Sequence, residues 1–187
     1  MISEGKIGKS IDNILSSAGG GDELKIGVFY LSDRKVIKAI KRAVVNGADV
    51  KILLDYNKDA FGREKNGIPN RTAAEEIYKE TDGKVKIYWY KSSGEQFHTK
   101  LLYFRKGSKV WITGGSANFT RRNLRDLNLE ENLLIETEKG EEIETEVSKY
   151  FEKIFTPQYS TEYKYINEGN GKYLIYRFQE WSGIGTF

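Results

Sequence analysis

The sequence has no cysteine, one histidine, two prolines and no long apolar run. Without cysteine there are no disulfide bonds or thiolate metal sites, and one histidine leaves little from which to build a zinc site. We therefore expect neither a metal nor another cofactor. The longest apolar run, from Ile26 to Leu31, is too short to span a bilayer, and the N-terminus lacks the apolar core of a signal peptide. We expect a cytoplasmic protein, or a secreted or membrane-associated one if the chain is cut from a longer precursor.

The net charge is also small. The 30 basic and 27 acidic residues leave a net charge of +3, which is too small to indicate nucleic-acid binding unless the charges cluster. With 187 residues, 39% of them hydrophobic, the chain is long enough for one ordinary globular domain. We expect a single domain over residues 1–187, with a tyrosine-rich C-terminal tail from about residue 157.

Hydrophobic spacing changes repeatedly between the strand and helix periods, which predicts an α/β fold. A strand over 24–30, a helix capped by Ser32 or Asp33 and a buried strand over 50–54 predict a right-handed parallel crossover. Further strands are predicted over 84–90, 97–104, 109–113 and 128–136, and further helices from a cap at Ser3 and over 70–81, 118–125 and 140–155. We expect a mixed, largely parallel central sheet of about seven strands with helices on both faces.

Candidate functional residues gather between Gly94 and Glu130. His98 and Lys100 are two residues apart in a predicted strand, so their side chains are expected on the same face. A phosphodiester needs donors for its charge, which Lys100, Ser116, Asn118 and the backbone N–H of Gly115 would supply.

A histidine nucleophile also needs an acceptor on its second ring nitrogen, and Glu130 is the nearest acidic candidate in this stretch. Alone, a single histidine is more often structural and a Gly-Gly-Ser turn is more often only a turn. Together, in this order, the residues indicate phosphodiester chemistry.

These residues also form a family pattern. His98-x-Lys100, then Gly115-Ser116-x-Asn118, then Asn128-x-Glu130 resembles the signature of the phospholipase D superfamily. The resemblance extends over nearly the whole chain, which is similar to the C-terminal half of bacterial two-motif phospholipase D-like proteins. It implies a metal-independent phosphodiesterase that works through a covalent phosphohistidine, with His98, Lys100, Ser116, Asn118 and Glu130 as catalytic residues, and with Lys100, Ser116 and Asn118 binding the phosphate.

One residue departs from the pattern. The family usually has aspartate five residues after the lysine, whereas this chain has Arg105, and the spacing to the Gly-Ser turn is longer. Both changes fall at the predicted hairpin turn, so we expect them to alter the turn more than the reactive groups.

The single histidine predicts a partner. While one imidazole carries the phosphoryl group, a second group must protonate the leaving oxygen, and the chain has no second histidine. We expect either a homodimer with a composite site or a complementary N-terminal half on another chain.

Several alternatives remain open from the sequence. The substrate is a nucleic acid if Arg121, Arg122 and Arg125 contact phosphates, or a phospholipid if the aromatic tail meets a lipid interface. A non-catalytic phosphate-binding or dimerisation module would also fit Arg105 and the missing histidine. A serine hydrolase is a poorer alternative, because Asn118 stands where the Gly-x-Ser-x-Gly motif has glycine.

Diesterase activity is predicted to survive in EDTA, because the proposed nucleophile is an imidazole and not a metal-bound water. The measurement is turnover of a chromogenic phosphodiester with and without excess chelator. Loss of turnover in EDTA would contradict the phosphohistidine mechanism.

Overall fold

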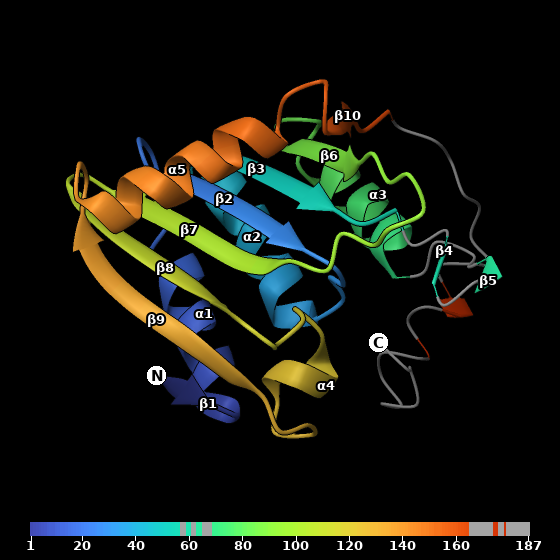
Figure 1. Cartoon of the computed structure of the whole chain (residues 1–187), viewed down its shortest axis with the longest axis horizontal. Helices are drawn as coiled ribbons and strands as arrows, with labels where there is room; N and C mark the ends of the chain where they lie inside the picture. Colours follow the sequence, from blue (N-terminus) through green and yellow to red (C-terminus); the bar gives the residue numbers. More distant parts are fainter. Residues whose placement is uncertain (57–58, 61–62, 65–68, 165–173, 176–177, 179–187) are drawn as a thin grey trace.

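An eight-stranded mixed sheet forms the centre of the computed structural model, which describes residues 1–56, 59–60, 63–64, 69–164, 174–175 and 178 (Figure 1). The strand order is β1-β9-β8-β7-β2-β3-β6-β10. The strands are β1 Ile2–Ser3, β2 Glu23–Val28, β3 Asp49–Leu54, β6 Lys86–Tyr90, β7 Lys100–Lys106, β8 Lys109–Gly115, β9 Glu131–Glu138 and β10 Ser160–Glu162, while β4 Asp59–Ala60 and β5 Arg63–Glu64 pair separately.

Helices cover both faces of the sheet, as predicted (Figure 1). They are α1 Gly5–Ser16, α2 Arg34–Val45, α3 Asn70–Glu80, α4 Arg121–Leu124 and α5 Glu142–Ile154. The larger core lies between the sheet and α1, α2 and α3, and the smaller one lies under α5. Helix α2 begins where the sequence predicts, because the Asp33 carboxylate accepts the N–H groups of Lys35 and Val36, both at 3.0 Å.

The predicted α/β class and mixed sheet are confirmed, with eight strands in place of about seven. The expectation of a largely parallel sheet was wrong, because only the β2–β3 and β3–β6 ladders are parallel among the described strands. Strands β7 and β8 are joined by a turn too short for a parallel crossover, so they pair antiparallel. Strands β8 and β9 also pair antiparallel, across the longer connection that contains α4. The additional strand β10 lies in the predicted tail and pairs with β6.

The N-terminus also differs from the prediction. Ser3 does not cap α1, because it lies in β1 opposite Glu131. Helix α1 instead begins after Glu4, and the Gly5 N–H donates to the side chain of Asp126. Among the described residues, no helix has the length and apolarity needed to cross a bilayer. The expectation of a single domain over 1–187 stays a prediction.

The sheet register brings the ends of six strands to one edge. Val28, the last residue of β2, lies opposite Leu54 of β3 and Lys100, the first residue of β7. Gly115, the last residue of β8, lies opposite Asn132 near the start of β9. The carboxyl ends of β2, β3, β6 and β8 therefore meet the amino ends of β7 and β9, which places all the sequence-predicted site residues at this edge.

A buried ion cluster ties α3 to α2. The side chain of Glu76 is 2% exposed, and its two carboxylate oxygens accept from Arg34 at 2.6 Å each and from Lys41 at 2.8 Å. Burial raises the pKa of Glu76, but the hydrogen bonds and charges of Arg34 and Lys41 outweigh it and lower the pKa to about 2.

Glu76→Gln is predicted to destabilise the fold by about 3 kcal/mol near neutral pH. Because the folded-state pKa lies below the unfolded value, this contribution is present above the unfolded pKa and is lost as the pH falls toward 2. Urea unfolding at neutral pH and at about pH 3 should therefore show a smaller difference at the lower pH. Glu75→Gln is the control, since the ion pair of Glu75 within the described part of the chain is with the half-exposed Lys79. Equal losses in the two variants would contradict this account.

Candidate active site

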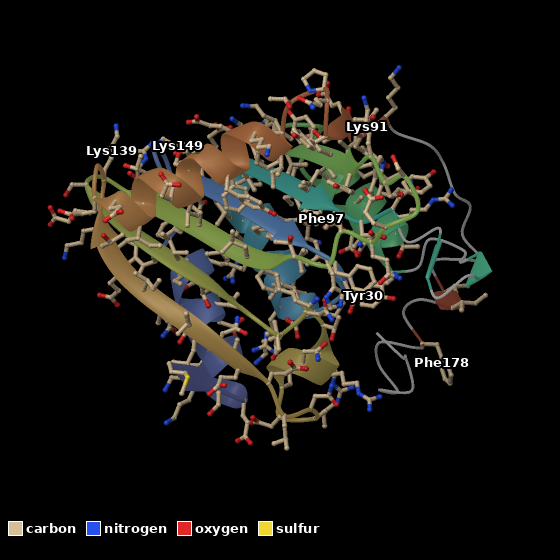
Figure 2. The ribbon with its side chains drawn as sticks, viewed as in Figure 1. Tyr30, Lys91, Phe97, Lys139, Lys149 and Phe178 are labelled. Carbon is tan, nitrogen blue, oxygen red and sulfur yellow. The ribbon has the colours of Figure 1, made fainter. Side chains whose placement is uncertain are left out.

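His98 lies just before β7 and not within it, which corrects the prediction that the strand begins at residue 97. Its segment is held by its neighbours at the sheet edge. The Phe97 N–H donates to the Asp55 carboxylate at 2.8 Å, and the Phe29 N–H donates to the Thr99 carbonyl at 2.8 Å. Figure 2 shows Phe97 and Tyr30 at this edge of the sheet. His98 is itself exposed, and its ring packs 4.9 Å from that of Phe29.

Asn70, the first residue of α3, connects the backbone segments that follow β2 and β3. Its side chain is fully buried and bonds three backbone groups: it accepts the Leu31 N–H at 2.8 Å and donates to the carbonyls of Phe29 at 2.6 Å and Asp55 at 2.8 Å. One buried side chain therefore joins the segments that follow β2 and β3.

The Lys100 side chain contacts the backbone of His98, whereas the prediction was that the two side chains share one face of a strand. The side chain of Lys100 is nearly buried, and its ammonium donates to the His98 carbonyl at 2.8 Å and lies 5.3 Å from the Phe29 ring. Burial lowers the pKa of Lys100 to about 8, although the charge of Glu130 opposes this. A buried ammonium with so little compensation favours the binding of an anion beside it.

The Gly-Ser turn approaches β9 very closely. A Cβ added to Gly115 would lie 2.2 Å from the Glu131 carbonyl oxygen, so no larger residue fits without a backbone shift. The Ser116 N–H donates to that carbonyl at 3.0 Å, and the Ala117 N–H donates to the Asn132 side chain at 3.3 Å. These two N–H groups hold the turn. The Asn118 side-chain amide can donate to a ligand, whereas the Ser116 hydroxyl already donates to the Glu130 carboxylate.

Among the described residues, Glu130 contacts Ser116 and not its own His98. Its carboxylate accepts from the Ser116 hydroxyl and from the side chains of Asn123 and Asn128. Of the two roles predicted for Glu130, orienting an imidazole of a facing half is therefore the one this geometry favours.

Asn118 contributes an unsatisfied polar atom. Within the described part of the chain, its Oδ1 atom is buried and has no hydrogen-bond partner. The residue is fixed through its neighbour, because the Phe119 N–H donates to the Tyr30 carbonyl at 3.0 Å and the Phe119 carbonyl accepts from Ser32 and Asp33 at 2.9 Å. Buried polar atoms are rarely left unpaired, so a ligand or partner group is expected at Asn118.

The electrostatics keep His98 neutral. Partial burial and the positive charge of Lys100 lower the pKa of His98, while the carboxylate of Asp55 raises it, and the net direction is down. A neutral imidazole has a nitrogen lone pair available for attack at physiological pH.

The arginines divide into two groups. Arg125 forms ion pairs with Asp12 at 2.8 Å and Asp33 at 2.7 Å, so it joins α1 to the start of α2 and is not placed to contact successive phosphates. Arg121 and Arg122 are exposed on α4. Arg105 pairs with Glu23 at 3.2 Å near the far end of β7, which confirms that this departure lies away from the reactive groups.

Sequence reasoning missed the residues that position the site. These residues, which carry no motif, are Asp55, Asn70, Asn123 and Asn132. Asp55, Asn70 and Asn132 act through contacts 15 or more residues away, and Asn123 contacts Glu130 seven residues away. The one available signal was the position of Asp55 directly after a buried strand.

A family model described as "Cardiolipin synthase, PLD-like domain" matches residues 11–155. This chain belongs to the phospholipase D-like family. A search of curated proteins found no match to this phospholipase D-like chain.

Solved structures share the fold of this phospholipase D-like chain. Nuc of Salmonella typhimurium, titled a phospholipase D family member, has a TM-score of 0.64 at 17% identity over 84% of this chain and 90% of its own. NucT of Helicobacter pylori has a TM-score of 0.57 at 19% identity, covering 84% and 92%. Phosphatidylserine synthase of Haemophilus influenzae has a TM-score of 0.66 at 16% identity, covering 95% of this chain but 43% of its own.

The pKa of His98 is predicted to move in opposite directions in two variants. Lys100→Met should raise it, because a neighbouring positive charge is removed, and Asp55→Asn should lower it, because a negative charge is removed. The chain has one histidine, so a proton NMR titration of the imidazole reports this group alone. A pKa that fails to rise in Lys100→Met would contradict the geometry described for this pair.

Proposed function

We propose that the chain is a metal-independent phosphodiesterase that works through a phosphohistidine on His98. The observation that carries this proposal is the position of His98, whose pKa is lowered, two residues before the nearly buried Lys100, whose ammonium bonds the His98 carbonyl at the sheet edge. An imidazole with an available lone pair beside a desolvated cation fits attack on an anionic phosphodiester. Family membership supports the same reaction class.

The reaction proceeds in two steps. A ring nitrogen of His98 attacks phosphorus, the N–P bond forms as the P–O bond to the leaving group breaks, and the leaving oxygen takes a proton from a second imidazole. That imidazole then takes a proton from water as the water oxygen attacks phosphorus and the N–P bond breaks. Lys100, Ser116 and Asn118 hold the nonbridging oxygens as charge develops on them.

The second imidazole comes from another motif. The sequence contains one histidine, and Glu130 is bonded to Ser116, from which it can face an incoming imidazole. A second copy of the chain, related by a two-fold axis, is the simplest source, and a complementary half on another chain is the alternative. Each composite site then contains two histidines and two lysines.

His98→Asn is predicted to lower kcat on a phosphodiester by about 10² to 10⁴ or more, because the nucleophile is lost. Steady-state kinetics with a chromogenic diester measure this, and Thr99→Ser is the control, since it keeps the hydroxyl that contacts Tyr150. Unchanged turnover in His98→Asn would support a non-catalytic phosphate-binding or dimerisation module instead.

Mixing wild-type chain with His98→Asn chain is predicted to suppress the wild-type activity, if subunits are allowed to exchange. A composite site needs two intact histidines, so activity should follow the square of the wild-type fraction. Light scattering on the same mixtures checks that dimers are present. Activity that follows the wild-type fraction linearly would show that each chain works alone or with a different partner.

A further inference from the structure

A pocket of about 330 Å³ opens beside His98 and extends beneath the C-terminal end of α5. It lies between the segment that carries His98 and the region where α5 ends and β10 begins. Four of its lining residues are aromatic, namely Tyr90, Phe97, Tyr150 and Tyr159. A volume at the lower end of the range for ligand pockets suits one planar ring system with its sugar better than two long acyl chains.

The rings of Tyr90 and Tyr150 are held by contacts with other lining residues, and the backbone of Tyr159 is held by Lys91. Tyr90 stacks on the buried Phe97, with ring centroids 5.0 Å apart and planes inclined by 22°. The Tyr150 hydroxyl lies 3.1 Å from the Thr99 hydroxyl, next to His98 in the chain. The backbone carbonyl of Tyr159 accepts the Lys91 N–H at 2.8 Å. Rings fixed in this way bind another ring with little loss of conformational entropy.

The polar lining is positive and contains no carboxylate. Lys153, in the last turn of α5, lies 5.2 Å from the centre of the Tyr159 ring, and among the described residues its ammonium has no ion pair. Gln96 adds an amide group beside it. The carboxylate of Glu95, which is not a lining residue, hydrogen-bonds the Tyr90 side chain. The lining itself therefore presents tyrosine rings with one ammonium, which fits an aromatic ligand attached to a phosphate.

We propose that this pocket is a base-binding subsite, which holds a nucleobase of a nucleic-acid strand while the adjoining phosphodiester lies at His98. The inference rests on the proposed function and names its substrate class. Stacking of the base on the tyrosine rings supplies affinity, because every base has an aromatic face. Lys153 contacts the neighbouring phosphate or a base oxygen, and Gln96 bonds the edge of the base.

The test compares oligothymidylate with an abasic oligomer of the same length, using the full chain. Tyr90→Ala should lower kcat/KM on oligothymidylate by about 5- to 150-fold, the usual range for a stacked base. The abasic oligomer should be cleaved equally by the wild type and Tyr90→Ala, and Tyr90→Phe should keep the wild-type rate. Lys153→Ala should also weaken oligothymidylate cleavage.

Matched controls lie on the same elements. Tyr88 shares a face of β6 with Tyr90 but packs on Phe155 outside the pocket, so Tyr88→Ala should leave the ratio of the two substrates unchanged. Lys149 lies one turn before Lys153 on α5, pairs with Glu146 and does not line the pocket, so Lys149→Ala is the control for Lys153→Ala.

Three results would overturn the subsite. In the first, Tyr90→Ala leaves kcat/KM on oligothymidylate unchanged. In the second, Tyr90→Ala lowers kcat/KM equally on both oligomers. In the third, Tyr90→Ala lowers turnover of phosphatidylglycerol vesicles alone, which would assign the pocket to lipid. If the wild type cleaves none of these substrates, the proposed function fails. Fluorescence anisotropy with the His98→Asn chain then still decides the subsite, because tighter binding of oligothymidylate than of the abasic oligomer must depend on Tyr90.

Discussion

The antiparallel pairing of β7 with β2 is the constraint on which the rest of the site depends. It sets Lys100 opposite Val28, so the segment carrying His98 runs past the carboxyl ends of β2 and β3. The β7–β8 and β8–β9 ladders then bring Gly115 and Asn132 to the same edge. A one-residue slip would turn Lys100 to the opposite face of the sheet and separate it from Glu130.

The site is arranged for a negative charge that the chain itself does not supply. Lys100 is nearly buried against the Phe29 ring and a backbone carbonyl, and the Oδ1 atom of Asn118 has no partner within the described residues. The buried ammonium is stabilised once a phosphate lies beside it. The Oδ1 atom of Asn118 is an acceptor, so it needs a hydrogen-bond donor from a facing motif or ligand and not a phosphate oxygen. The single histidine also predicts a partner, because the nucleophile and the group that protonates the leaving oxygen must be two different side chains.

Local signals in the sequence predicted the elements that depend on neighbouring residues. Asp33 caps α2 through N–H groups two and three residues away, and the hairpin turn after Lys106 joins two adjacent strands. The direction of the strands was harder, because the pairing of β7 with β2 joins residues far apart in the chain. The β10 strand escaped prediction for the same reason, since Ser160–Glu162 is short and becomes a strand only beside β6.

In the candidate site, too, local patterns were predictable from the sequence and long-range contacts were not. His98, Lys100, Ser116, Asn118 and Glu130 were found from spacing and family pattern, and the structure brings them to one edge of the sheet. The residues that aim them, such as Asp55 and Asn70, act through bonds to distant backbone groups and leave no pattern in the sequence. Arg125 was considered as a phosphate contact because it lies near the motif in the sequence. In the structure it forms ion pairs with Asp12 and Asp33 instead.

The covalent intermediate is the most direct test of this account. Brief reaction with a phosphodiester, acid-free quenching and peptide mass spectrometry should detect a base-stable, acid-labile phosphoryl adduct on the peptide that contains His98, the one histidine of the chain. The adduct should disappear in His98→Asn. Turnover without any adduct on His98, or an adduct on a serine such as Ser116, would contradict the phosphohistidine mechanism.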